Sequence, residues 1–194
     1  MDFQFYPIKS HDLPEIMQIQ KECYSEELLE SMESFEHKLK LSPDTCYLIK
    51  HNNETAGYYF SLPCMKSHLP SFNDNHFQIP AQPDCLYLHD LAIKKAYRKQ
   101  GIPTLVFQHV SQYAFRLNIF CFRIFSVQNT YEKWKAYGFR KVTDLNPELT
   151  EKINSFQGKA VLMELNISPS ALWFLTLMMT DIVFRHWWCW FLRI

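Results

Sequence analysis

The chain has 194 residues and a mass of 23.2 kDa, the size of one domain with an appendage, which excludes two full domains. Hydrophobic residues make up 47% and charged residues 21% of the chain, a composition that excludes intrinsic disorder. The 20 Lys and Arg residues balance 20 Asp and Glu residues, so we expect no sequence-independent binding of nucleic acid.

The first half of the chain predicts a strand, two helices and a hairpin. Apolar residues alternate from Phe3 to Ile8 and predict a half-buried strand. The cap residues and proline of Ser10-His11-Asp12-Leu13-Pro14 begin a helix, and residues 34–41 predict a second one. The β-branched and aromatic runs at 45–50 and 56–62 flank a turn-rich break and predict a hairpin.

The second half begins with a long loop and then alternates strands and helices. Residues 63–84 contain four prolines and predict an irregular loop, which at this length is typical of a functional segment. Strands are predicted at 85–93, 121–127, 139–142 and 159–167, and helices at 103–117 and 130–137. The resulting order, β-α-α-β-β-β-α-β-α-β-β, predicts an α/β fold with one central mixed sheet flanked by helices.

The sequence changes character after residue 167. Residues 171–194 are mostly apolar and hold four of the five tryptophans, but charged residues from Asp181 onward interrupt the run before a spanning helix is complete. We therefore divide the chain into a domain of residues 1–167 and a tail of residues 168–194. The tail suits contact with a membrane surface or with another subunit, such as a second copy of the chain, or has no selected role.

The cysteines and the amino terminus bear on location. Six cysteines are scattered without a Cys-x-x-Cys pair, which is typical of buried residues in a reducing compartment and not of a disulfide framework or a metal site. The first residues lack a basic segment followed by an apolar stretch, so they do not predict a secretory signal. The expected location is cytoplasmic, and no metal is expected.

The segment from Cys85 to Leu117 carries the strongest functional signal. A strand leads into a basic turn with a glycine, and a proline opens the helix that follows. Free N–H groups and the positive end of a helix dipole then point to one place, which is typical of phosphate binding. The alternative is an ordinary connection with a solvated basic face.

Two motifs resemble the GCN5-related N-acetyltransferases (GNAT). The segment Arg98 to Pro103 resembles the pyrophosphate loop of that family, and Val127 to Phe139 resembles its Asn, short helix and terminal Gly-Phe. The resemblance extends from Phe3 to Ile167, and within the family the chain is similar to a bacterial branch related to arylalkylamine acetyltransferases. It implies an acyl-CoA N-acyltransferase fold and transfer of the acetyl group of acetyl-CoA to an amine.

The same resemblance implies which residues contact acetyl-CoA. The backbone of β-strand residues Leu91, Ala92 and Ile93 would bind the pantetheine arm, and Asn129 would lie near the thioester. The loop that would bind the pyrophosphate comprises Arg98, Lys99, Gln100, Gly101, Ile102, Pro103 and Thr104. Pro103 departs from the family pattern because it lacks an N–H donor, which implies weaker or altered binding that the Thr104 hydroxyl compensates.

The reaction requires a base, because an alkylamine is mostly protonated at pH 7. An imidazole has an ordinary pKa of about 6.5, and His89 shares a strand face with Tyr87, so His89 is the predicted base. A buried structural histidine is the alternative. Asp90 is left with three roles: orienting His89, binding the substrate ammonium, or pairing with a lysine. The Leu91 N–H is the expected donor to the carbonyl oxygen.

The acid that protonates the leaving thiolate is less evident. Trp134 stands four residues before Gly138, where many relatives carry a tyrosine, and an indole is not a practical acid. Tyr131, one helical turn earlier, is the predicted acid because it lies nearer Asn129, and Tyr137 is the alternative.

The acceptor pocket is expected to come from the loop at 63–84, with His68, Phe72, His76 and Phe77. Its aromatic and amide composition suits a small amine with an apolar body. We therefore predict an acetyltransferase acting on a primary amine by direct attack. The alternatives are a catalytically impaired module that binds acyl-CoA or a partner, and acetylation of a protein amino terminus or lysine.

Overall fold

The computed structural model describes residues 2–156 and 160–170 and contains a seven-stranded sheet. The strands are β1 (Gln4–Pro7), β2 (Cys46–His51), β3 (Glu54–Cys64), β4 (Cys85–Ile93), β5 (Cys121–Ser126), β6 (Arg140–Lys141) and β7 (Val161–Asn166). Their spatial order is β1-β2-β3-β4-β5-β7-β6, and only the β4–β5 pair is parallel among the pairs of this sheet. The predicted α/β fold with a mixed sheet is confirmed.

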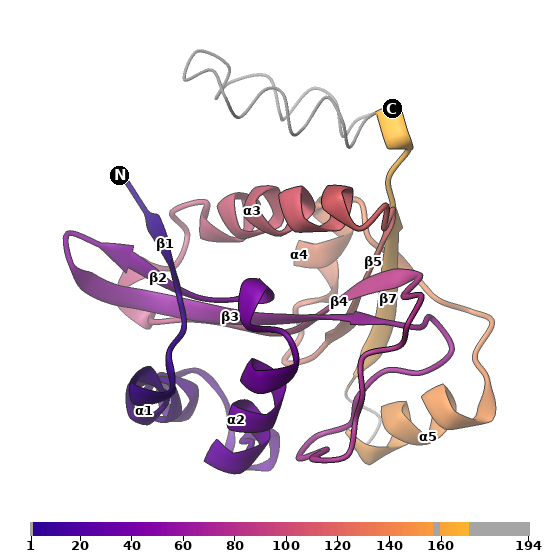
Figure 1. Ribbon diagram of the computed structural model, residues 1–194, viewed down its shortest axis with the longest axis horizontal. Coiled ribbons are helices and arrows are strands. Elements are labelled where there is room, and N and C mark those ends of the chain that lie inside the picture. Colours follow the sequence, from indigo (N-terminus) through magenta and orange to yellow (C-terminus); the bar gives the residue numbers. More distant parts are fainter. Residues whose placement is uncertain (1, 157–159, 171–194) are drawn as a thin grey trace.

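Helices cover both faces of the sheet (Figure 1). They are α1 (Leu13–Cys23), α2 (Met32–Leu41), α3 (Ile102–Arg116), α4 (Tyr131–Ala136) and α5 (Pro147–Ser155). The buried side of α3 packs on one face with Val106, Phe107 and Val110, and α1 and α2 pack on the opposite face with Ile16 and Phe35. Leu149 of α5 joins a third apolar cluster, which contains residues of β3, β4, β5 and β7.

The sequence prediction omits α5. This helix begins after Asn146, whose side chain accepts a hydrogen bond from the Leu149 N–H at 2.8 Å, and Pro147 occupies its first position. Both features are regular signals of a helix start. The segment Asn-Pro-Glu therefore predicts the start of this helix. The omission matters because α5 forms part of the cavity described below.

A bulge in β4 re-aims two polar side chains. Asp90 pairs with Phe60 and Leu88 pairs with the next residue of β3, Ser61, so His89 has no partner in the register. One extra residue breaks the alternation of side chains between the two faces. His89 and Asp90 consequently point to the same face of the sheet, the face that α1 and α2 cover. On that face His89 bonds to Glu30, which precedes α2, and Asp90 bonds to Tyr24, which follows α1.

The parallel strands β4 and β5 separate just before this bulge. Within the described residues, they pair only at Leu86 with Phe122 and at Tyr87 with Arg123. From the bulge onward the β5 side of β4 is open, and this gap is the entrance to the candidate site.

Gly57 of β3 is required by the close approach of β4. A β-carbon at this position would lie 2.3 Å from the Ala92 carbonyl oxygen and 3.1 Å from the Ile93 Cα. Because paired backbone cannot move aside, we expect Gly57→Ala to lower the free energy of unfolding by about 1–3 kcal/mol. Urea unfolding measures this change, and an unaltered midpoint would contradict the packing described.

The tail prediction falls mostly outside the described residues, because residues 171–194 are not among them. Within residues 2–156 and 160–170, no helix is long and apolar enough to cross a membrane.

Candidate functional site

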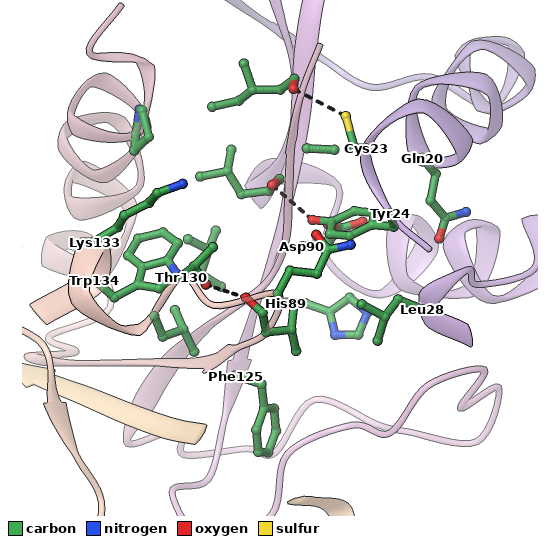
Figure 2. Close-up of a pocket in the computed structure, with 18 of the residues that line it drawn as sticks. Gln20, Cys23, Tyr24, Leu28, His89, Asp90, Phe125, Thr130, Lys133 and Trp134 are labelled. Carbon is green, nitrogen blue, oxygen red and sulfur yellow. Dashed lines mark hydrogen bonds between the residues drawn. The ribbon is translucent and has the colours of Figure 1, made fainter. Parts of the chain in front are cut away.

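A cavity of about 850 Å³ occupies the gap where β4 and β5 separate. Its walls come from α1, β4, the turn before α3, β5, α4 and α5. Figure 2 shows Cys23 and Tyr24 on one wall and Lys133 and Trp134 on the opposite wall, with His89 near the centre.

The structure brings eight of the predicted site residues to this cavity: His89, Leu91, Ala92, Ile93, Arg98, Lys99, Gly101 and Pro103. They lie along β4 and the following turn. The predicted strand and glycine turn are therefore adjacent parts of one cavity, which extends from the bulge to the start of α3.

Five predicted residues do not line the cavity: Gln100, Ile102, Thr104, Asn129 and Tyr131. Ile102 is buried in the core beneath α3, and the Gln100 side chain donates to the Ala96 carbonyl at 3.1 Å. The Thr104 N–H donates to Gly101 at 3.1 Å. Asn129 is exposed in a turn, and its neighbours Gln128 and Thr130 line the cavity instead.

The turn before α3 has the backbone of an anion-binding loop. Lys99 and Gly101 both have positive φ, at 65° and 77°, and α3 begins directly afterwards with Ile102. Pro103 is the second residue of the helix, where its missing N–H takes no bond from the helix interior. Two left-handed residues before a helix start direct N–H groups outward, as in phosphate-binding nests.

Backbone groups of β4 face the gap. The Lys94 N–H donates to the Ala56 carbonyl of β3 at 2.9 Å, and in an antiparallel pair alternate residues bond to the same neighbour. The polar groups of Leu91 and Ile93 therefore point away from β3 and toward the cavity, where an extended ligand can pair with them.

Side chains at the carboxyl end of α1 and in the basic turn bond to the carbonyls of Leu91 and Ile93. The Tyr24 hydroxyl lies 3.0 Å from the Leu91 carbonyl oxygen, and the Cys23 thiol donates to that of Ile93 at 3.3 Å (Figure 2). The Arg98 Nε–H also donates to Ile93, at 3.0 Å. Tyr24 and Cys23 are thus wall residues that the sequence prediction missed.

The side chain of His89 is 3% exposed and bonds to Glu30 through Nε2. A carboxylate only accepts hydrogen bonds, so Nε2 carries a proton and the neutral ring keeps its lone pair on Nδ1. Nδ1 is buried and has no partner among the described residues. The ring therefore has one nitrogen fixed by the protein and one nitrogen left for a ligand.

Glu30 is fixed in turn by a buried network. Its carboxylate accepts from Lys38 at 2.6 Å and from Ser34 at 2.7 Å, and its backbone N–H and carbonyl both bond to the side-chain amide of Gln20. Burial alone would raise the pKa of Glu30, but His89 and Lys38 hold it well below its usual range. Glu30 is therefore an ionised carboxylate directed at His89.

Asp90 neither orients His89 nor pairs with a lysine, which are two of the three roles that the sequence left open. Its two carboxylate oxygens accept hydrogen bonds from the Tyr24 and Tyr58 hydroxyls, the latter at 2.8 Å. Burial raises the pKa of Asp90, although both phenols and the neighbouring His89 oppose this rise. The residue that orients His89 is Glu30.

Of the predicted acid Tyr131 and its alternative Tyr137, only Tyr137 belongs to the α4 wall of the cavity. Trp134 and Tyr137 line the cavity, whereas Tyr131 packs half-buried against the apolar cluster beneath α3. Gly138 ends the helix with a φ of 90°, and the Phe139 N–H returns to the Trp134 carbonyl at 3.2 Å. Glycine is thus confirmed as the left-handed cap.

The far end of the cavity is apolar and aromatic. Phe72, Phe125 and Phe156 line it, and the Phe156 ring contacts both other phenylalanines, with centroids 4.8 and 5.3 Å away. Of the four loop residues predicted here, only Phe72 is in the lining. The other three lie elsewhere: Phe77 is buried in the apolar cluster around Leu149, His68 pairs with Glu148, and His76 is exposed.

Comparisons with known proteins agree with this geometry. The sequence profile of the Acetyltransferase (GNAT) family matches residues 13–137. No curated protein has a matching sequence.

Three solved structures illustrate the similarity of fold. The GNAT-like decarboxylase GphF, in complex with isobutyryl-CoA, is 14% identical, with a TM-score of 0.67 over 84% of this chain and 98% of its own. The PaiA N-acetyltransferase of Thermoplasma acidophilum, in complex with coenzyme A, is 15% identical, with a TM-score of 0.62 over 86% of this chain and 100% of its own.

The ribosomal-protein-S18-alanine N-acetyltransferase of Escherichia coli is also 15% identical, with a TM-score of 0.58 over 86% of this chain and 95% of its own. At these identities the structures establish the fold, and the profile match over most of the chain establishes the family. The chain belongs to the acetyltransferase (GNAT) family and to its enzyme class, the acetyl-CoA-dependent N-acetyltransferases.

Proposed function

We propose that the protein transfers the acetyl group of acetyl-CoA to a small primary amine with an apolar body, with His89 as the base. The observation that carries this proposal is the Glu30–His89 pair, in which the Nδ1 of a cavity-lining histidine has no partner among the described residues of an acetyltransferase fold. A histidine with one nitrogen held by a carboxylate is a regular arrangement for accepting a proton at the other nitrogen.

Each residue of this site has a separate role in the proposed reaction. His89 takes the proton of the attacking amine at Nδ1, and the resulting imidazolium is stabilised by the ionised Glu30 carboxylate. Lys38 keeps that carboxylate ionised. The Leu91 N–H faces the gap and donates to the carbonyl oxygen as negative charge develops there. The amine nitrogen gains the acetyl group as the carbon–sulfur bond breaks.

The acceptor class follows from the lining at the far end of the cavity. Phe72, Phe125 and Phe156 provide apolar ring surface, and the Glu30 carboxylate is already paired with Lys38. Such a pocket favours an arylalkyl or alkyl amine over an amine with a charged body.

The test is release of CoA thiol with a panel of arylalkyl, alkyl and polyamine acceptors and amino-terminal peptides, with the acetylated product identified by mass spectrometry. We expect turnover with arylalkyl and alkyl amines. Turnover restricted to peptides would assign the enzyme to protein acetylation, and CoA binding without any turnover would support a binding module.

Under this proposal, the phosphate groups of CoA bind at the turn before α3. Lys99 lines the cavity, whereas the exposed Lys95 of the same turn does not. We expect Lys99→Gln to weaken CoA binding about tenfold, the effect of losing one hydrogen bond to a charged group. Calorimetry measures the affinity, and Lys95→Gln is the matched control. Equal losses in both variants would mean that the turn attracts CoA only through its overall charge.

A further inference from the structure

Asp90 is a carboxylate on the cavity wall that has no cation beside it. Its two oxygens accept hydrogen bonds from the Tyr24 and Tyr58 hydroxyls, which is the pattern of an ionised group. Among the residues that the structure describes, no lysine or arginine pairs with it. A carboxylate has about four positions for hydrogen bonds, so Asp90 has room to accept further donors from a ligand.

Asp90 also lies directly beside the proposed base. The bulge of β4 turns Asp90 and His89 to the same face of the sheet. Tyr24, which donates to Asp90, lies 3.0 Å from the carbonyl oxygen of Leu91, the residue whose N–H faces the gap. Figure 2 shows Asp90 next to Tyr24 and across the cavity from Lys133. An amine that binds beside His89 is therefore also beside the Asp90 carboxylate.

The charges around this point leave an excess of negative charge. Lys38 balances Glu30, and the His89 ring is neutral, but nothing of opposite charge balances Asp90 among the described side chains. Burial raises the pKa of Asp90 and the charge of Glu30 adds to this rise, whereas the two phenols and His89 oppose it. A cation in the cavity would stabilise the buried carboxylate, and an alkylamine is itself mostly a cation at pH 7.

We propose that Asp90 binds the acceptor as its ammonium ion and holds it beside His89 until a proton is transferred. This inference rests on the proposed function. One N–H of the ammonium donates to the Asp90 carboxylate, and another gives its proton to Nδ1 of His89. The electron pair of that N–H bond stays on the amine nitrogen as the lone pair that attacks the thioester. Asp90 keeps its own charge and is a binding residue.

The first test uses the unaltered protein and requires no turnover. Calorimetry measures the Kd of phenethylamine for the complex of the protein with CoA. Between about pH 7.5 and about pH 9, the neutral fraction of such an amine rises about 30-fold, while the ammonium remains the main form. If Asp90 binds the ammonium, the Kd for total amine stays nearly constant over this range. A Kd that falls in proportion to the neutral fraction would overturn the proposal.

The neighbours of Asp90 are compatible with this pH range. The titratable side chains that face Asp90 are Cys23 and Tyr24 at the end of α1, Tyr58 of β3, Glu30 before α2 and His89 of β4. Burial raises the pKa of the thiol and of both phenols, and Glu30 is ionised. The range therefore begins above the ordinary pKa of an imidazole and ends below the pKa of these phenols.

Asp90→Asn removes the charge and keeps the size of the side chain. At about pH 7.5 we expect the Kd of phenethylamine to rise about 10- to 100-fold, the effect of losing a hydrogen bond between two charged groups. Phenethyl alcohol has the same body without the charge, so its Kd should not change. Asp84→Asn is the matched control, because Asp84 is exposed before β4 and outside the cavity lining. Equal weakening of amine and alcohol in Asp90→Asn would reduce Asp90 to a structural role and overturn the proposal.

These binding measurements separate the proposal from acetyl transfer. A protein that acetylates no amine but binds the ammonium through Asp90 would keep this assignment and lose the proposed function. Turnover of alkylamines with an unchanged Kd and KM in Asp90→Asn would keep the proposed function and overturn this assignment. Unchanged CoA affinity in Asp90→Asn shows that the variant is folded.

Discussion

Replacing Glu30 by glutamine is expected to lower the free energy of unfolding at pH 7 by about 3–5 kcal/mol. The side chains of Glu30 and Lys38 are 3% and 0% exposed and lie 2.6 Å apart. The amide would leave the Lys38 ammonium buried without its counter-charge, and this desolvated charge is the source of the loss. Chemical denaturation monitored by tryptophan fluorescence measures the change.

Glu36→Gln is the matched control for this prediction. It makes the same chemical change on α2, but Glu36 is 44% exposed and its pair with Lys40, at 3.3 Å, is a surface pair. We expect an effect of at most about 0.5 kcal/mol. Similar losses in the two variants would show that the buried network does not contribute as described.

The effect of Glu30 also depends on pH in a defined direction. Its pKa is lower in the folded protein than in the unfolded chain, where a glutamate titrates near pH 4.3. The stability that it contributes is therefore complete above that pH and is lost as the pH falls toward the folded pKa. The difference between the wild type and Glu30→Gln should shrink below about pH 4.3, and a constant difference would contradict the ionised pair.

Replacing His89 by glutamine is expected to lower kcat/KM for an accepted amine by about 10²–10⁴-fold, the usual contribution of a general base. Glutamine retains a hydrogen bond to Glu30 but cannot take a proton at the position of Nδ1. Steady-state thiol release measures the change. His51→Gln, in the β2–β3 hairpin and outside the cavity lining, should retain wild-type activity.

Loss of activity in His89→Gln has a structural explanation that must be separated from the catalytic one. Circular dichroism and CoA affinity of the variant should match the wild type if His89 acts on the amine. A variant that no longer binds CoA would instead show that His89 holds the strands apart at the bulge.

The strand and the turn that are proposed to bind the cofactor could be located from the sequence because their signals are local. The apolar run of β4 is bounded to the residue as predicted, Cys85–Ile93, and the turn with Gly101 follows within one segment. A left-handed glycine before a helix and a glycine after one are fixed by backbone sterics, which act over a few residues.

The partner of His89 could not be predicted in the same way. Glu30 and His89 are 59 residues apart, and the segment that contains Glu30 also contains Glu26 and Glu27. No spacing indicates which carboxylate is buried, since the Lys38 and Gln20 contacts that select Glu30 arise only when α1 and α2 pack together. Tyr24 was missed for the same reason.

The claim that His89 accepts the amine proton is tested most directly by the pH dependence of kcat/KM with an arylamine of low pKa. Such an amine is already neutral over the pH range studied, so an acidic limb reports the enzyme. We predict that this limb is present in the wild type and in His51→Gln and disappears in His89→Gln. The same limb in all three proteins would contradict His89 as the base.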